Sequence, residues 1–341
     1  MRAVLAESDE KPAAYGHIGV IGAGSWGTAL ALVAAEAGRR VTLWARTRET
    51  AEAMAASRQN AAYLPGLRLP DAIKPTHDLA SAAGAEAVLV VVPAQHLRPV
   101  LETAAPLIAP GAPVVICAKG IEKASGLLMT EVLAAAAPRA EAAILSGPSF
   151  AHDVARHLPT AVTIAAGMAV AERLQASLGS ASFRPYASDD LVGVALGGAA
   201  KNVYAIACGI VDGLGLGESA RAALLARSFA ELRRFGAALG ARPETLMGLS
   251  GLGDLVLTAT SMTSRNFAFG AAIGSGRPRA DWFAQGRPLA EGAATAPALV
   301  LRARQLGIEL PVAEAMARIL DGSLNLKAAA AHLMQRPLKA E

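Results

Sequence analysis

The amino-acid sequence predicts an α/β domain with a doubly wound, mostly parallel sheet, followed by an all-α domain. Three observations support this: short apolar runs alternate with alanine-rich helical segments from residue 17 onward, a glycine-rich turn follows the first run, and the strand signal disappears after about residue 189. The chain has 341 residues, of which 53% are hydrophobic, enough for two hydrophobic cores. We predict a loose tail over residues 1–16, the α/β domain over 17–188 and the helical domain over 189–335.

The predicted strands are continuous apolar runs rather than alternating ones. Such strands are typical of parallel sheets whose two faces are both covered by helices. The runs span residues 17–22, 40–45, 87–92, 113–118, 142–147 and 161–166. Two helices are clear between the strands, at residues 28–37 and 50–57. In the second half, helical patterns separated by glycine-rich breaks span residues 192–210, 219–239, 243–249, 264–273, 295–306 and 312–320.

Composition and charge argue against several classes of protein. The net charge is only +4, and lysine and arginine form no block with interleaved aromatic residues, so we expect no nucleic-acid partner. Cys117 and Cys208 lie in apolar runs without a CxxC motif or clustered histidines, which disfavours disulfides and a metal site. The first 16 residues lack a signal-peptide core, and the apolar stretches 88–92 and 206–211 are too short to span a bilayer. We predict a cytoplasmic protein without stable membrane insertion.

A glycine motif follows the first predicted strand. Gly22, Gly24 and Gly27 form the pattern GxGxxG between a strand and a helix. The first glycine permits a tight turn, the second lets a pyrophosphate approach the backbone, and the third lets the helix pack on the strand. The N-terminus of that helix offers free N–H groups to phosphates. The motif in this position predicts a Rossmann domain that binds a dinucleotide.

The residues after the second predicted strand bear on which dinucleotide binds. A carboxylate about twenty residues after the glycines would bind the ribose 2′-hydroxyl of NAD, but this sequence has Arg46, Thr47 and Arg48 there. Arginine can accommodate the 2′-phosphate of NADP. NADP and NAD both stay possible cofactors, because these arginines could also be solvated loop residues.

Lys201 lies within LGGAAKNVYAIACGIVDG, a run of small and apolar residues that favours a buried helix. A buried ammonium is costly unless it is paired or its pKa shifts. A nicotinamide enzyme acting on a secondary alcohol needs a group that exchanges the hydroxyl proton, and a desolvated lysine can do so near neutral pH. Lys119, at the end of a predicted strand, is either a second cation that lowers the pKa of Lys201 or an exposed loop lysine. Asp254, among glycines and leucines, would orient the Lys201 ammonium and limit the fall of its pKa.

Two further stretches offer donors for an anionic substrate. SGPSF ends the strand after that of Lys119 and presents the Ser149 hydroxyl and backbone N–H groups to the same edge of the sheet. In the second half, Ser264, Arg265 and Asn266 form a compact set of donors, and the planar guanidinium suits a phosphate. The alternative is that Ser264 caps a helix and the next two residues are polar surface positions.

Taken in order, the motifs GAGSWGTALA, NAAYLPG, KGIE, SGPSFA, LPTAV, GGAAKNVYAIA, GLGDLVLT, SRN and EG resemble those of bacterial NAD(P)-dependent glycerol-3-phosphate dehydrogenases. The resemblance covers nearly all of residues 17–335. It implies a Rossmann domain and a helical domain that supplies a catalytic lysine. It also implies interconversion of sn-glycerol 3-phosphate and dihydroxyacetone phosphate for phospholipid synthesis, and a homodimer.

The resemblance assigns roles to matching positions in this sequence. Lys201 matches the proton acceptor, Lys119 and Asp254 lie beside it, and Thr258 matches a threonine near the reacting carbon. The positions implied to contact the dinucleotide, besides the three glycines, are Ser25, Trp26, Arg46, Tyr63, Lys119, Ala151, Arg265, Leu289 and Glu291. The positions implied to contact substrate are Lys119, Gly147, Ser149, Lys201, Asp254, Ser264, Arg265 and Asn266.

Two other functions remain open from the sequence. One is reduction of another small keto or hydroxy acid on a similar two-domain scaffold, which would not need the donors at 264–266. The other is a non-catalytic regulator that binds the nucleotide. The presence of Lys119, Lys201 and Asp254 together disfavours the regulator.

Overall fold

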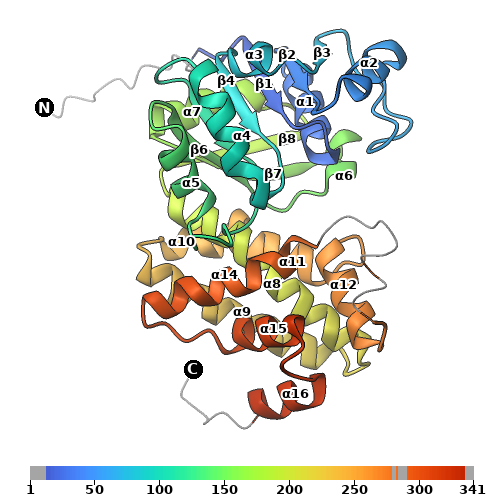
Figure 1. The fold of residues 1–341 in the computed structure, drawn as a ribbon, viewed down its shortest axis with the longest axis vertical. Helices are drawn as coiled ribbons and strands as arrows, with labels where there is room; N and C mark the ends of the chain where they lie inside the picture. The colour runs from blue at the N-terminus through green and yellow to red at the C-terminus, as the bar shows by residue number, and fades with distance from the viewer. Residues whose placement is uncertain (1–12, 279–281, 283–289, 335–341) are drawn as a thin grey trace, which may run out of the picture.

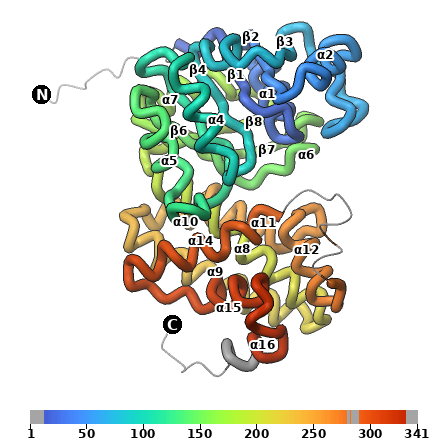
Figure 2. The backbone as a smooth tube through the Cα atoms, viewed as in Figure 1, coloured from blue at the N-terminus to red at the C-terminus, as the bar shows by residue number. Residues whose placement is uncertain are grey.

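A computed structural model describes residues 13–278, 282 and 290–334. Figure 1 shows a sheet with covering helices in the upper half of the molecule and a group of helices in the lower half. The tube in Figure 2 runs from blue to green within the upper half before the yellow-to-red part of the chain forms the lower half. The last strand ends at Ser188 and the first helix of the lower half begins at Leu191, on either side of the predicted boundary.

The sheet has eight strands in the order β3-β2-β1-β4-β5-β6-β7-β8. Neighbouring strands are parallel except β6 and β7, which are antiparallel. The sequence predicts six of them within one or two residues, and the mostly parallel α/β class is confirmed. The strands are β1 (His17–Ile21), β2 (Arg40–Trp44), β3 (Ile73–Thr76), β4 (Ala87–Val90), β5 (Pro113–Ile116), β6 (Glu141–Ser146), β7 (Thr160–Ala165) and β8 (Phe183–Ser188).

The two strands absent from the prediction, β3 and β8, are the edges of the sheet. Each contains a proline, Pro75 in β3 and Pro185 in β8, which an edge strand tolerates because one side forms no ladder. Buried residues alternate with exposed ones at the start of both strands. The continuous apolar run that marks a central parallel strand is therefore missing.

Helices cover both faces of the sheet, as the apolar strands predict. Successive residues of β4 point to opposite faces: Val88 and Val90 join a core with α4 and α5, whereas Leu89 joins a second core with α1 and α7. Cys117 and Cys208 are buried and free. The helices of this half are α1 (Ser25–Glu36), α2 (Arg48–Ser57), α3 (Leu79–Ala83), α4 (Leu97–Ala104), α5 (Met129–Ala136), α6 (Ala151–Ala155) and α7 (Met168–Leu178).

The helical half is built around α8 (Leu191–Gly213), which is buried from Gly193 to Ile210. Its length and apolar composition would suit a membrane span, but 94% of its most apolar window is buried by the neighbouring helices. It is thus the core helix of this domain, as the burial of the run around Lys201 predicts. Around it lie α9 (Glu218–Ala238), α10 (Pro243–Met247), the π-helical turn η3 (Leu249–Gly253), α11 (Asp254–Ala259), α12 (Arg265–Gly274), α14 (Glu291–Gln305), α15 (Pro311–Asp321) and α16 (Leu326–Met334).

The end of the predicted tail is part of the fold, so the prediction for residues 1–16 is wrong at that end. Tyr15 is only 6% exposed, and the guanidinium of Arg173 lies over its ring at 3.8 Å. The Tyr15 backbone N–H also donates to the Ser177 hydroxyl at 2.8 Å. Both contacts hold Tyr15 against α7. Residues 1–12 lie outside the described part of the chain.

A buried carboxyl in the helical half leads to a prediction about stability. Glu231, on α9, accepts hydrogen bonds from the backbone N–H groups of Val312 (2.7 Å) and Ala313 (3.3 Å) in the first turn of α15. The Tyr204 hydroxyl of α8 donates to the same carboxylate at 3.4 Å. Burial raises the pKa of Glu231 to about 7, and the two backbone donors oppose that shift.

We expect this carboxyl to make the protein less stable as pH rises from about 4.5 to about 7. A carboxyl with a raised pKa binds its proton more tightly in the folded state than in the unfolded state, so stability is lost as that proton leaves. Glu231→Gln should remove about 3 kcal/mol of this pH dependence. Urea unfolding of both proteins across this pH range measures the difference, and parallel curves would contradict the prediction.

Candidate active site

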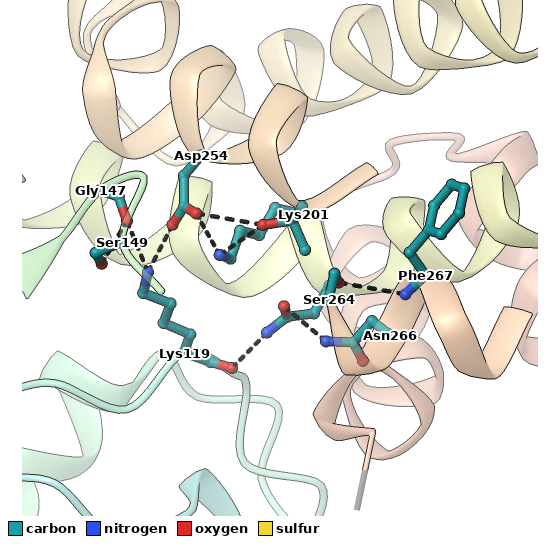
Figure 3. Close-up of polar contacts among 10 residues, drawn as sticks. Lys119, Gly147, Ser149, Lys201, Asp254, Ser264, Asn266 and Phe267 are labelled. Atoms are coloured by element: carbon teal, nitrogen blue, oxygen red, sulfur yellow. Dashed lines mark hydrogen bonds and ion pairs between the residues drawn. The ribbon is translucent and has the colours of Figure 1, made fainter. Parts of the chain in front are cut away.

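Two lysines from different halves of the chain meet at one buried carboxylate, shown in Figure 3. Lys119 follows β5, and its Nζ donates to Asp254 Oδ2 at 2.6 Å. Lys201, in the middle of α8, donates to Asp254 Oδ1 and to the Thr258 hydroxyl, the latter at 2.9 Å. Asp254 is fully buried and Lys201 is 7% exposed. The structure thus brings together all four residues predicted to be catalytic.

The surroundings of Lys201 lower its affinity for a proton. Burial lowers the pKa of Lys201 to about 7, the negative charge of Asp254 opposes that shift, and the positive charge of Lys119 adds to it. These are the influences that the sequence predicts for a buried lysine with a second cation and an orienting carboxylate.

Local sequence explains how Asp254 reaches this position. The glycine-rich stretch before it forms the π-helical turn η3, in which a Cβ on Gly251 would lie 1.9 Å from the carbonyl oxygen of Leu246. Only glycine lets the chain turn this tightly. Asp254 is then the first residue of α11, where a carboxylate is favoured by the helix dipole, and Thr258 follows one turn later on the same face.

The SGPSF stretch holds Lys119 from the sheet side. The carbonyl oxygen of Gly147, just after β6, accepts hydrogen bonds from Lys119 Nζ (3.0 Å) and from the Ser149 hydroxyl (3.0 Å). Gly147 has a φ of +153°, and a Cβ there would lie 2.8 Å from Val162 Cα. Because β5 and β6 are parallel neighbours, the residues that follow them lie at the same edge of the sheet. Gly147 and Ser149 therefore belong to the lysine–aspartate cluster.

A chain of amides links the two halves beside the lysines. Asn202 Nδ2 donates to the Lys119 carbonyl oxygen (3.2 Å), and Asn266 Nδ2 donates to Asn202 Oδ1 (2.9 Å). The backbone N–H of Gly292 donates to Asn266 Oδ1 at 3.0 Å. The sequence interpretation did not single out Asn202. A polar amide next to Lys201 in an apolar helix would have been a signal for it, because a buried amide also needs partners.

The three donors at the start of α12 have different surroundings. Ser264 caps the helix, its hydroxyl accepting a hydrogen bond from the Phe267 N–H at 3.3 Å, as the alternative interpretation predicts. Asn266 is buried rather than on the surface, so that alternative is wrong for Asn266. Arg265 is exposed, and its charge opposes the rise that burial causes in the pKa of Glu291 at the start of α14.

The glycine motif has the geometry that a dinucleotide requires. Gly22 has a φ of +119°, and a Cβ on Gly27 would lie 1.8 Å from the Gly22 carbonyl oxygen. A Cβ on Gly24, in contrast, would meet nothing within 4 Å, and no side chain caps the N-terminus of α1. The open space at Gly24 and the uncapped N–H groups suit a pyrophosphate.

The other positions predicted to contact the cofactor surround this turn only in part. The Ser25 hydroxyl donates to the Tyr63 carbonyl oxygen at 3.4 Å, and Trp26 is the next residue of α1. Asn60, which was not predicted, anchors the Tyr63 loop by donating to the carbonyl oxygen of Ala23 at 2.9 Å. Arg46 is exposed beyond β2, whereas Ala151 begins α6, which packs against α1. Leu289 lies outside the described residues.

The described residues also bear on metal binding. Over residues 13–278, 282 and 290–334, no group of three or more His, Cys, Asp and Glu side chains is placed to hold a metal ion. The charged groups that the cluster offers for chemistry are therefore the two lysines and Asp254.

Comparison with known proteins identifies the family. Residues 17–171 match the sequence model of the N-terminal part of NAD-dependent glycerol-3-phosphate dehydrogenase, and residues 190–331 match that of its C-terminal part. The chain belongs to the NAD-dependent glycerol-3-phosphate dehydrogenase family. The resemblance drawn from the motifs is thus confirmed.

Individual members of the family are similar over almost the full length. The chain is 56% identical to glycerol-3-phosphate dehydrogenase (NAD(P)+) of Parvibaculum lavamentivorans, over 96% of this chain and 99% of that protein. It is 59% identical to the same enzyme of a Bradyrhizobium species, over 95% of this chain and 98% of that protein. The crystal structure of glycerol-3-phosphate dehydrogenase from Coxiella burnetii has a TM-score of 0.89 at 38% identity and covers 94% of this chain and 99% of its own.

Proposed function

We propose that this protein catalyses the reversible, NAD(P)-dependent reduction of dihydroxyacetone phosphate to sn-glycerol 3-phosphate. The observation that carries the proposal is the buried carboxylate of Asp254 holding both Lys201 and Lys119, in a chain of the glycerol-3-phosphate dehydrogenase family. A buried lysine whose pKa is about 7 can give and take a proton at neutral pH.

In this proposal the α/β half binds the cofactor. Gly24 and the N-terminus of α1 would hold the pyrophosphate, with Ser25 and Trp26 beside it. When bound, NAD(P)H supplies the hydride for reduction of the substrate carbonyl. The cluster around Asp254 lies past the ends of β5 and β6, at the sheet edge where parallel sheets bind ligands.

Lys201 handles the proton. In reduction, its ammonium donates a proton to the oxygen of the former carbonyl, and in oxidation its neutral amine accepts the proton of the hydroxyl group. Asp254 and Thr258 accept two of the hydrogens on Lys201 Nζ and so direct the third. Lys119, the second cation, stabilises the negative charge that develops on the substrate oxygen.

The start of α12 would bind the phosphate of the substrate. The Arg265 guanidinium is exposed and offers a planar set of donors. The Ser264 hydroxyl accepts from a backbone N–H, so its own hydrogen stays available to an anion. Asn266 is engaged on both its amide nitrogen and its oxygen, and its role is to hold the start of α14 at Gly292 and α8 together.

An assay of NADPH oxidation with dihydroxyacetone phosphate tests the proposal. We expect turnover with the phosphorylated ketone and much weaker activity with unphosphorylated dihydroxyacetone. Equal activity with both ketones would favour reduction of another small keto acid. Cofactor binding without oxidation of NADPH on any keto-phosphate would favour a regulator. Either result would overturn the proposed reaction.

Arg46 is expected to favour NADPH over NADH. It is exposed just beyond β2, where it could reach a 2′-phosphate, and no interaction with another described residue engages it. Arg46→Ala should raise the KM for NADPH about tenfold and leave that for NADH unchanged, since one charge-assisted contact is lost. Arg48→Ala is the matched control, because Arg48 pairs with Glu52 on α2. A wild-type KM lower for NADH than for NADPH would refute the preference.

We propose further that the protein acts as a cytoplasmic homodimer without membrane insertion, as the motifs imply. The burial of α8 supports the absence of membrane insertion, because its apolar surface is already covered by other helices of the same chain. Sedimentation analysis of the purified protein measures the oligomeric state. A monomer at working concentration would contradict the dimer.

A further inference from the structure

We propose that Asp190, together with Gly193 and Gly197, sets the position of the segment 242–258 along α8 and thereby the contact between Lys201 and Asp254. Asp190 would then be a positioning residue for the proton-transfer group. The inference rests on the proposed function, in which that contact matters for the reaction.

One face of α8 follows the segment 242–258 over its whole length. Residues 193, 197 and 201 are spaced by four and so lie on one face of the helix. Their nearest neighbours in the segment are Thr245 at the first position, Ser250 and Gly251 at the second, and Asp254 and Thr258 at the third. The neighbours advance in the same direction as the helix, so α8 and the segment run side by side.

Close contact at two glycines of α8 fixes the distance between α8 and the segment 242–258. A Cβ on Gly197 would lie 2.5 Å from the Ser250 carbonyl oxygen and 3.0 Å from Gly251 Cα. A Cβ on Gly193 would lie 2.9 Å from Thr245 Cγ2 and 2.2 Å from Asp190 Oδ2. These positions bring η3, the turn immediately before Asp254, as close to α8 as a helix allows.

Asp190 links the start of α8 to the start of the segment 242–258. Its side chain is 5% exposed, its Oδ1 accepts the Gly193 N–H (2.8 Å), and its Oδ2 accepts the backbone N–H of Arg242 (2.9 Å). The same carboxylate therefore caps α8 and holds the residue before α10. The Arg242 guanidinium forms an ion pair with Asp189, and its Nε lies 4.0 Å from Asp190 Oδ2.

A change at Asp190 should alter the pKa of Lys201. The charged groups that influence Lys201 are Asp254 from α11, Lys119 from the loop after β5 and Glu291 from α14. Of these, Asp254 makes the direct contact and raises the pKa of Lys201. If the segment shifts along α8, that contact weakens and the pKa of Lys201 falls further.

Two variants test the inference in different ways. Asp190→Asn keeps one oxygen for a backbone N–H but leaves the other N–H facing an NH₂ group, which cannot accept it. Gly197→Ala adds a Cβ against η3. Asp78→Asn is the control for the first, because Asp78 caps α3 away from the site. Gly213→Ala is the control for the second, because its Cβ would lie 2.2 Å from the Ala271 carbonyl oxygen, further along α8 against α12.

The measurement is the titration of Lys201 by NMR in full-length protein with ¹³C-labelled lysine, assigned by comparison with Lys201→Arg. We expect Asp190→Asn and Gly197→Ala to lower the pKa of Lys201 and to reduce kcat roughly 10–100-fold, with the KM for NADPH unchanged. The controls should change only thermal stability. An unchanged or raised pKa of Lys201 in both variants, or an equal fall in Gly213→Ala, would overturn the inference. Wild-type protein without activity would contradict the proposed function alone, since the titration does not depend on turnover.

Discussion

Lys201→Ala is expected to lower kcat for ketone reduction by roughly 10²–10⁴-fold while leaving the KM for NADPH nearly unchanged. In the proposed reaction, the variant removes the group that donates the proton, whereas the glycine turn that would hold the cofactor is built from β1 and α1. The substitution also removes one of the two ammonium groups that pair with Asp254. The charge of Asp254 is still neutralised by the other, Lys119. The loss should therefore appear in turnover rather than in folding.

Steady-state rates with NADPH and a fluorescence titration of NADPH binding separate these effects. Lys123→Ala is a suitable control, because Lys123 is exposed in the same loop as Lys119 and lies outside the cluster. Loss of cofactor binding in Lys201→Ala, with kcat retained at saturating NADPH, would mean that the lysine is structural.

Asp254→Asn should have the second large effect, on both stability and rate. The substitution leaves two ammonium groups, Lys119 and Lys201, facing each other without the carboxylate between them. Breaking a buried ion pair by removing one partner typically costs 3–5 kcal/mol, so we expect a loss of about that size in the free energy of unfolding. The pKa of Lys201 should also fall below about 7, because Asp254 is the group that opposes the effect of burial.

The pH dependence of the rate distinguishes this variant from one that is merely unstable. Reduction requires protonated Lys201, so a lower pKa moves the fall in kcat at high pH toward lower pH. Asp212→Asn is the control, since it breaks a more exposed pair with Arg221 on the protein surface. Unchanged pH dependence with lower stability would show that Asp254 only supports the fold.

The central part of the fold could be predicted from sequence because its strands are buried on both faces. Val88, Leu89 and Val90 illustrate this, since each is fully buried and yet they point into two different cores. The edge strands β3 and β8 could not be found in this way, since they bury only alternate residues and contain proline. The antiparallel pairing of β6 with β7 has no signal in the apolar pattern, because pairing direction depends on the path of the connection.

The site was predictable where a charge stands among apolar residues. Lys201 and Asp254 are charged residues in apolar segments. Each offsets the free-energy cost of burying the other's charge, because they form an ion pair. Asn202 and Asn60 are equally buried or nearly so, but an amide carries no charge and stands out less. Which residues meet could not be read from spacing alone, because Lys119 and Asp254 are 135 residues apart and join only through the packing of two domains.

Because Asp254 binds a lysine from each half of the chain, the reactivity of Lys201 depends on a completed interface. The loop after β5 brings the second positive charge, and the same loop receives the amide of Asn202 from α8. A molecule in which the helical half has formed but the sheet half has not would lack Lys119 at the carboxylate. Its Lys201 would be closer to an ordinary lysine, protonated and solvated. In the proposed mechanism, proton transfer by Lys201 at neutral pH therefore depends on both halves of the chain being folded and packed together.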